Sequence, residues 1–202
     1  MIYNLKIPDD LDKISGLRMG DVLYITGKVF TARDEAHQLM LELHEKGEKL
    51  PFDPSKMVLY HCGPVVKREN NEWKVLAAGP TTSSRMDLFE KEVIEIYGVR
   101  IIVGKGGMGD RTSEALKKVK GIYATYTGGA GALAAKSFKK VLSVYYLEEL
   151  GSPEAIWIFE AENFGPLIVS IDPDGKNWNK LSRDEMEKRK KEIFELIDHE
   201  GN

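Results

Sequence analysis

The stretch Val99-Arg100-Ile101-Ile102-Val103-Gly104-Lys105-Gly106-Gly107-Met108-Gly109-Asp110 passes from a β-branched run through a glycine loop into a polar segment. Its first part, Val99–Val103, predicts a short buried strand, and Gly104–Gly109 predicts a loop. A helix is expected from Asp110 to about Val119, followed by another short strand at Ile122–Thr125. Strand–loop–helix–strand units of this kind are typical of α/β folds.

Outside this unit, strands are expected mainly towards the two ends of the chain. Because strands and helices alternate only in the middle, we predict an α/β fold with a mixed sheet or partly closed barrel and flanking helices. No linker divides the chain, so residues 1–202 are expected to form one domain. The other strands are predicted at Tyr3–Ile7, Asp21–Phe30, Met57–Tyr60, Trp73–Ala78, Ser137–Leu147, Ala155–Glu162 and Leu167–Ile171, and the other helices after Thr31, after Thr81–Ser84, after Gly131 and over Glu185–His199.

Composition excludes several classes of protein. The 202 residues include 29 Lys+Arg and 32 Asp+Glu, so the net charge of -3 gives no overall basic surface for nucleic acid. No stretch approaches the roughly 20 apolar residues that span a membrane. The single cysteine, Cys62, excludes an internal disulfide and an iron–sulfur cluster held by this chain alone. A reducing cytoplasm is the expected compartment.

Three cations lie where helices are expected to begin, although free N–H groups and the helix dipole make acidic residues more favourable there. Arg33 follows Thr31, which we predict to cap a helix because Asp34 stands at capping-box spacing. Arg85 follows a Gly-Pro-Thr-Thr segment, and Lys105 lies in the glycine loop. Any one of them is explained by a solvated side chain. Three together indicate a bound carboxylate or phosphate, provided that their loops meet at one end of the sheet.

The glycine loop has three interpretations. Gly104–Gly109 matches the G-x-G-x-x-G pattern of dinucleotide-binding folds. That pattern also requires an acidic residue about 20 positions later, and Tyr123–Gly128 contains none. The other two interpretations are a loop that cradles a compact anion beside Lys105, and a tight turn that needs glycine.

Thr81 and Thr82 precede the helix that carries Arg85. A hydroxyl in this position is most often a cap or turn residue. It acts as a base only where cations or a metal stabilise its alkoxide, and Arg85 lies one helical turn beyond Thr81. The residue pattern alone does not choose between the two threonines.

The histidines and the cysteine suggest no site of their own. His37 and His44 are two turns apart on one expected helix, so they are badly placed to share a metal ion. His61 and His199 add no metal-ligand spacing, and all four are expected to be surface or supporting residues. Cys62 is predicted to be a buried thiol rather than a nucleophile.

Five motifs, in order along nearly the whole chain, resemble the β subunit of class I fumarate hydratase and L(+)-tartrate dehydratase. The motifs are Thr31-Ala32-Arg33-Asp34-Glu35-Ala36-His37, Gly79-Pro80-Thr81-Thr82-Ser83-Ser84-Arg85-Met86-Asp87, Gly104-Lys105-Gly106-Gly107-Met108, Thr127-Gly128-Gly129-Ala130 and Trp157-Ile158-Phe159-Glu160-Ala161-Glu162-Asn163-Phe164.

The resemblance implies a swivelling β/β/α domain and a hydro-lyase that adds water reversibly to a dicarboxylate. It implies a [4Fe–4S] cluster held by a separate α subunit, and an α2β2 assembly. On this sequence it assigns Arg33, Arg85 and Lys105 to the substrate carboxylates and Thr81 to proton transfer at carbon. The same three cations stand out from the helix-dipole argument.

Four hypotheses about function follow. The first is the β subunit of a fumarate hydratase of the tricarboxylic acid cycle, and the second is the β subunit of an L(+)-tartrate dehydratase, whose substrate carries a further hydroxyl. A third is an independent anion- or nucleotide-binding module that uses Gly104–Gly109. The fourth is a structural partner that only shields the cluster.

Overall fold

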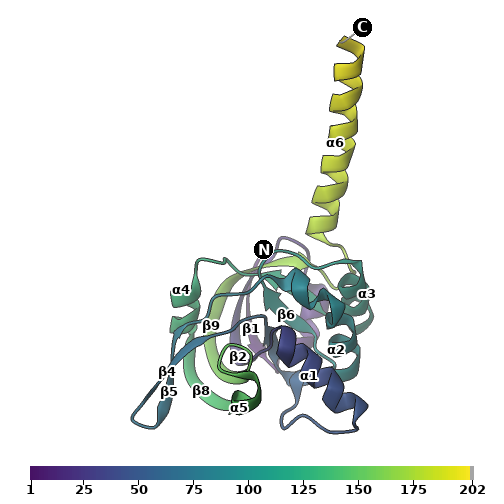
Figure 1. The fold of residues 1–202 in the computed structure, drawn as a ribbon. Helices are drawn as coiled ribbons and strands as arrows, with labels where there is room; N and C mark the ends of the chain where they lie inside the picture. Colours follow the sequence, from purple (N-terminus) through teal and green to yellow (C-terminus); the bar gives the residue numbers. More distant parts are fainter. Residues whose placement is uncertain (201–202) are drawn as a thin grey trace.

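The computed structural model describes residues 1–200, with side chains as far as residue 195. Figure 1 shows a body of strands and shorter helices from which one long helix, α6, projects. The strands are β1 Ile2–Ile7, β2 Val22–Thr31, β3 Val58–Tyr60, β4 Val65–Glu69, β5 Glu72–Ala77, β6 Ile101–Gly104, β7 Ile122–Thr125, β8 Phe138–Tyr145 and β9 Ile156–Ile171. The α-helices are α1 Asp34–Glu45, α2 Glu90–Tyr97, α3 Asp110–Val119, α4 Gly131–Ser137, α5 Leu147–Leu150 and α6 Trp178–Glu200, and the 3-10 helices are η1 Leu11–Gly16, η2 Pro54–Lys56 and η3 Ser83–Leu88.

Five strands close into a mixed barrel. Their order is β2-β3-β6-β7-β9, and β9 pairs with β2 as well as with β7. The first four strands run parallel to one another, whereas β9 is antiparallel to both of its neighbours in the barrel. Strand β1 extends the sheet beside β2, and β8 pairs with β9. The predicted α/β fold with a mixed, closing sheet is therefore confirmed.

Strands β3, β6 and β7 are buried on both faces, which explains their nearly continuous apolar sequences. In β6, Ile101 and Val103 join one core cluster, while Ile102 between them joins a second. The first cluster fills the barrel around Trp157 and Phe164. The second lies beneath the helices, where side chains of α1, α2 and α3 pack on the outer face of the strands. The alternation follows from the period of two in a β-strand.

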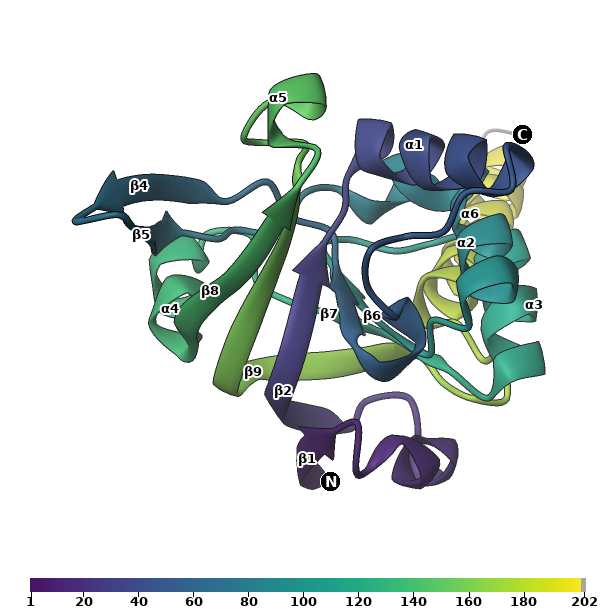
Figure 2. The same ribbon diagram turned by 90° about the horizontal axis from the view of Figure 1, so that it is seen from below.

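The helices and the hairpin lie on opposite sides of the barrel. Figures 1 and 2 show α1, α2 and α3 together on one side, and α4 with the β4–β5 hairpin on the other. Helix α6 begins at the body and projects away from it, and all of its described side chains, residues 178–195, are exposed. None of the helices described, up to residue 200, is long and apolar enough to cross a membrane.

The late part of the chain differs from the prediction, because the strands expected at Ala155–Glu162 and Leu167–Ile171 are one 16-residue strand, β9. The residues between them bend the strand without ending it. Asn163 takes a left-handed conformation, and Gly165 packs so closely on β2 that an added Cβ would lie 2.5 Å from the carbonyl oxygen of Leu23. A bend of this kind lets one strand pair with several neighbours as the barrel closes.

Three smaller predictions were also wrong. Strand β4 was not expected, yet it pairs with β5 as a hairpin whose turn residues, Asn70 and Asn71, have positive φ. The helix expected after Thr81–Ser84 is divided into η3 and α2 at Phe89, and α6 begins at Trp178 rather than Glu185. The short helices η1, η2 and α5 were not predicted either, whereas α3 and β7 agree with the prediction residue for residue.

Candidate functional site

The barrel brings the loops after its parallel strands to one edge. Arg33 follows β2, His61 follows β3 and Lys105 follows β6, and these strands are parallel neighbours. The segment before η3 returns to the same edge. The backbone N–H of Thr81 donates to the carbonyl of His61 at 2.8 Å, and that of Ser83 donates to the carbonyl of Lys105 at 3.0 Å. The loops of the three predicted cations therefore meet at one end of the sheet.

Arg33 occupies the N-cap position of α1, but Thr31 does not cap the helix as predicted. Thr31 is the buried last residue of β2, and its hydroxyl accepts from the backbone N–H of Trp157 at 3.0 Å. The helix N-terminus is satisfied from far along the chain instead. The Glu154 carboxylate accepts from the N–H of Glu35 at 3.2 Å and pairs with Arg33 at 3.1 Å. Burial raises the pKa of Glu154 although Arg33 opposes the shift.

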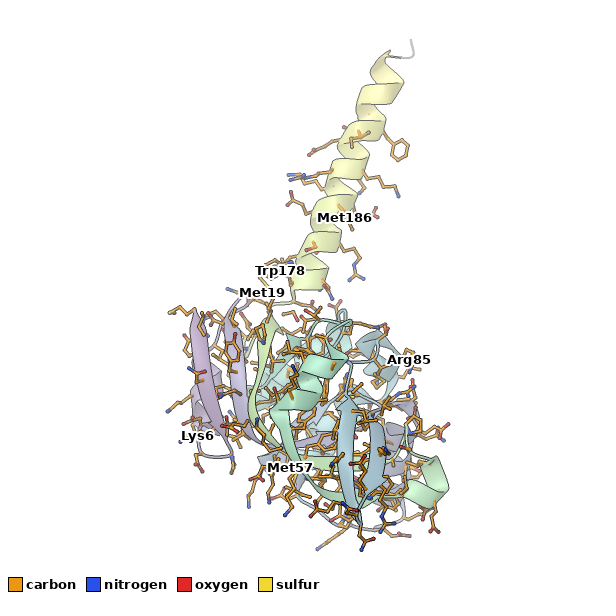
Figure 3. The ribbon with its side chains drawn as sticks, turned by 90° about the vertical axis from the view of Figure 1, so that its left-hand side faces the viewer. Lys6, Met19, Met57, Arg85, Trp178 and Met186 are labelled. Carbon is orange, nitrogen blue, oxygen red and sulfur yellow. The ribbon has the colours of Figure 1, made fainter. Side chains whose placement is uncertain are left out.

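Arg85 links the threonine to the beginning of α1. Its Nη2 atom donates to the Asp34 carboxylate at 2.6 Å and to the hydroxyl of Thr81 at 3.3 Å. The Arg85 side chain is 47% exposed, and Figure 3 shows Arg85 at the margin of the body, in the half from which α6 projects. A guanidinium has five N–H donors, so this arrangement leaves others for a ligand.

Lys105 is the one predicted site cation without an ion-pair partner among the side chains described, residues 1–195. Its aliphatic part passes against Gly128, where an added Cβ would lie 2.8 Å from the Cδ atom. The motif Thr127–Ala130 therefore leaves space for the side chain of Lys105 in the Gly104–Gly109 loop. Asn179, at the base of α6, supports the same loop by packing on Gly107.

The N-terminus of α3 already holds a carboxylate of this chain. The backbone N–H of Gly109 lies 3.0 Å from both carboxylate oxygens of Asp87, and the Thr112 hydroxyl donates to the same group at 2.5 Å. In a dinucleotide-binding fold the pyrophosphate occupies this position. The structure therefore argues against the dinucleotide interpretation of Gly104–Gly109.

Beneath the loops lies a polar cluster that the sequence did not reveal. His37, His61 and Glu90 have no exposed surface, and the Oε2 atom of Glu90 lies 2.9 Å from His61 Nε2 and 3.3 Å from His37 Nε2. Neither contact has the alignment of a full hydrogen bond. The potential ligand atoms of the three residues lie within 4.8 Å of one another, a spacing that also suits a metal ion.

The pKa values in this cluster diverge. Burial alone would lower the pKa of His37, but the Glu90 carboxylate outweighs it and the pKa is raised. Burial together with the neighbouring His37 lowers the pKa of His61. Although burial opposes ionisation of Glu90, both imidazoles favour it and hold its pKa down to about 2. These directions give a charged His37, a neutral His61 and an ionised Glu90.

The histidines were expected to be surface or supporting residues, and burial excludes a surface position for His37 and His61. His61 directly follows a buried strand, a position that could have drawn attention to it. The side chain of His199 lies outside the described residues. Cys62 is 1% exposed, and burial raises the pKa of its thiol, which confirms the predicted buried cysteine.

The larger cavities lie elsewhere. One of about 590 Å³ is lined by Gly27, Leu142 and Ile158 among others, and a second of about 570 Å³ is lined by residues near Phe52 and Tyr97. None of the four predicted site residues lines either cavity. The edge where the loops after β2, β3 and β6 meet carries these residues instead: Arg33, Thr81, Arg85 and Lys105.

Comparison with known proteins agrees with these motifs. The family described as fumarase C-terminus matches residues 3–181. A protein of Methanocaldococcus jannaschii, provisionally named L(+)-tartrate dehydratase subunit beta, is 44% identical over 164 residues, covering 81% of this chain and 84% of its own. The L(+)-tartrate dehydratase subunit beta of Escherichia coli K12 is 38% identical over 193 residues, covering 96% and 94%.

A third relative is a longer protein. It is provisionally named class I fumarate hydratase, comes from Geobacillus stearothermophilus, and is 35% identical over 198 residues. The match covers 96% of this chain but 37% of that protein. With a family match over most of its length and relatives of this similarity, the chain belongs to the fumarase C-terminus family, together with the β subunits of L(+)-tartrate dehydratase and the corresponding part of class I fumarate hydratase.

Proposed function

We propose that this chain is the β subunit of an iron–sulfur-dependent hydro-lyase that interconverts fumarate and L-malate. The observation that carries the proposal is the contact between Arg85 and the Thr81 hydroxyl at 3.3 Å, on a loop edge that also carries Arg33 and Lys105. This edge offers three cations and one hydroxyl to a small dianion. Family membership supports the reaction class.

The cations are proposed to bind the two carboxylates of the substrate. Lys105 has no ion-pair partner among residues 1–195 and offers a compact charge. Arg33 and Arg85 are each paired with one carboxylate of this chain, Glu154 and Asp34. Those acids orient the guanidinium groups, whose remaining N–H donors suit bidentate binding of a carboxylate. The same charges stabilise the negative charge that develops on the substrate carboxylate when a proton leaves the adjacent carbon.

Thr81 is proposed to move that proton. A threonine hydroxyl is a weak base in water, because its alkoxide is unstable there. Beside the Arg85 guanidinium the alkoxide is favoured by the positive charge and by a hydrogen bond that it accepts from Nη2. Thr82 is exposed and has no such contact among the described residues, so the proposal chooses Thr81 of the two threonines.

The residues of this chain do not suit a [4Fe–4S] cluster. The only cysteine, Cys62, is 1% exposed and its thiol has a raised pKa, whereas a cluster requires several accessible thiolates. We therefore assign the [4Fe–4S] cluster to an α subunit, as the β-subunit names of the relatives suggest a partner. The predicted residues line neither of the two cavities described above, and we propose that the α subunit completes the site.

Dehydration of L(+)-tartrate to oxaloacetate is the second candidate, because two relatives carry that name. Both substrates offer two carboxylates to the same cations. We place fumarate first because it uses only the groups already identified, while tartrate has a further hydroxyl that the proposal assigns to none of the described residues, 1–195.

The test is coexpression with the α subunit under anaerobic conditions, with the isolated chain as the control. We expect an active α–β complex, an α2β2 mass, and fumarate–malate turnover that exceeds tartrate turnover. The reverse ratio would identify the tartrate enzyme. A cluster-loaded complex without turnover of either substrate contradicts the proposal, and tight nucleotide binding by the isolated chain, measured by calorimetry, would favour an independent anion-binding module.

A further inference from the structure

The buried cluster of His37, His61 and Glu90 is connected to the loops that carry the proposed substrate residues. Glu90 is the first residue of α2, where the helix dipole favours an anion, and its carboxylate faces both imidazoles. Burying three ionisable side chains is costly, and well-packed apolar residues often replace buried ion pairs without loss of stability. The cluster therefore calls for an explanation other than stability.

The hydrogen positions at His37 are determined by its neighbours. Its Nδ1 atom lies 2.7 Å from the carbonyl oxygen of Arg33, and since a carbonyl only accepts, Nδ1 carries a proton. The Nε2 atom, which faces the Glu90 carboxylate, carries one as well when His37 is charged. His37 thus joins Glu90 to the backbone of Arg33.

The hydrogen positions at His61 are also consistent. Neutral His61 places its proton on Nε2, toward Glu90, and leaves Nδ1 as an acceptor. Ser83 then donates its hydroxyl proton to Nδ1 at 2.9 Å. The same Ser83 oxygen accepts from the N–H of Lys105 at 3.2 Å and from the hydroxyl of Tyr123 at 2.9 Å. The Tyr123 hydroxyl shares its one proton between Ser83 and the carbonyl oxygen of Gly106, which lies 3.1 Å away. With these proton positions, each hydrogen bond of His37, His61 and Ser83 joins a donor to an acceptor.

We propose that Glu90 is a positioning residue, which acts through His37 and His61 to hold the backbones of Arg33, Thr81 and Lys105 in the arrangement that binds substrate. One branch runs from Glu90 through His37 to the carbonyl of Arg33. The other reaches His61, whose carbonyl accepts from Thr81 and whose ring leads through Ser83 to Lys105. Displacements of about 1 Å in such groups reduce turnover by about 10²-fold. The inference rests on the function proposed above.

A metal ion is the competing explanation for the cluster. Tetrahedral zinc with bonds of about 2.0 Å separates its ligand atoms by about 3.3 Å. The His61–Glu90 contact is shorter, at 2.9 Å, and both imidazoles approach the same carboxylate oxygen. The hydrogen assignment above is also complete without a cation. We therefore prefer this arrangement of protons to a bound metal ion. The experiment below also measures the metal content of the protein.

The experiment compares Glu90→Gln with Glu92→Gln in the α–β complex. Glu92 is a matched control, because it lies on the same helix and pairs with Arg111 at the surface. We expect Glu90→Gln to lower kcat/KM for the substrate by about 10²-fold, with a raised KM, and Glu92→Gln to behave as the wild type. Ser83→Ala, which cuts only the branch to Lys105, is expected to raise KM while leaving the titration of His37 unchanged. Wild-type kcat and KM in both Glu90→Gln and Ser83→Ala would overturn the proposal.

A second readout does not depend on turnover. NMR of the full chain is expected to show a charged His37 near neutral pH in the wild type and a neutral one in Glu90→Gln. Amide shifts at Arg33, Thr81 and Lys105 are expected to move in Glu90→Gln but not in Glu92→Gln. Unchanged amides overturn the positioning role even if the complex proves inactive, and so does a stoichiometric metal ion that is lost in Glu90→Gln. If Glu90→Gln fails to fold, the Ser83→Ala amide shifts and kinetics decide.

Discussion

Arg85 donates to the hydroxyl of Thr81 across 3.3 Å, so the proposed proton-transfer group lies directly beside a positive charge. The same guanidinium nitrogen contacts Asp34, the first residue of α1, at 2.6 Å. The threonine loop is thereby tied to the helix that follows Arg33. Asp34 and Arg85 are 51 positions apart in the sequence, and their contact holds the guanidinium beside the Thr81 hydroxyl.

Arg85→Ala is expected to lower kcat/KM of the α–β complex by about 10²-fold or more, because it removes both a carboxylate ligand and the charge beside Thr81. Its effect on stability should be below about 1 kcal/mol, since the Asp34 ion pair is half exposed. Arg111→Ala is the matched control, because Arg111 is 53% exposed and pairs with Glu92 at 2.7 Å. Kinetics and thermal unfolding of both variants measure these two effects. Equal turnover of Arg85→Ala and Arg111→Ala would show that Arg85 does not contribute to the site.

Gly128→Ala is expected to reduce activity several-fold by displacing the Lys105 side chain, whose Cδ atom would lie 2.8 Å from the new methyl group. Gly129→Ala is its control, because an added Cβ there has nothing within 4 Å. Neither glycine has a positive φ, so both substitutions should leave stability nearly unchanged. If the two variants have the same KM for the dicarboxylate, the contact with Lys105 is not important for binding.

The Glu90 carboxylate should make stability depend on pH in the acid range. Its folded pKa of about 2 is below the ordinary 4.5, so its contribution is complete above about pH 5 and disappears as pH falls towards 2. At about 1.4 kcal/mol per pH unit, the difference amounts to about 3 kcal/mol. His37, with a raised pKa, remains charged throughout this range.

Subtracting the stability of Glu90→Gln would not isolate this contribution, because the variant also changes the titration of His37. The carboxyl carbon of Glu90, followed by NMR of the folded protein from pH 7 to pH 3, measures its pKa directly. The carboxyl group is expected to stay ionised over this range. A titration midpoint near the ordinary 4.5 contradicts a lowered pKa.

Cys62 should not react in the folded chain. Its thiol is 1% exposed and burial raises its pKa, so little thiolate is present and no reagent reaches it. A thiol reagent at pH 8 is expected to modify Cys62 only after denaturant is added. Stoichiometric modification of the native chain at the rate of a free thiol would show that the thiol is accessible.

Much of the middle of the fold could be predicted from local pattern. Helix α3 and strand β7 agree with their predicted bounds because a glycine loop, a β-branched run and the helical period mark them clearly. Strand β9 was divided in the prediction because Gly165-Pro166 resembles a break. Only the closure of the barrel, which no local pattern records, explains why the strand continues.

The loops of the three predicted cations meet at one edge of the sheet, but the ion-pair partners of the arginines could not be predicted. Glu154 pairs with Arg33 from 121 positions away, and the cluster of His37, His61 and Glu90 comes from three separate elements. A helix-dipole argument considers each helix separately. It identified Arg33, Arg85 and Lys105 as unusual, but it could not show which carboxylates pair with the two arginines. Contacts between distant segments depend on topology, which was available only from the structure.

The most direct test of the account is the turnover of Thr81→Val and Thr82→Val in the anaerobic α–β complex. Valine keeps the shape of threonine and removes the hydroxyl, and the backbone bond from Thr81 to His61 is unaffected. The account predicts that Thr81→Val lowers kcat for malate and fumarate by about 10²-fold or more, with KM within a few-fold of the wild type, while Thr82→Val remains active. Wild-type kcat in Thr81→Val, or loss of activity only in Thr82→Val, would contradict it.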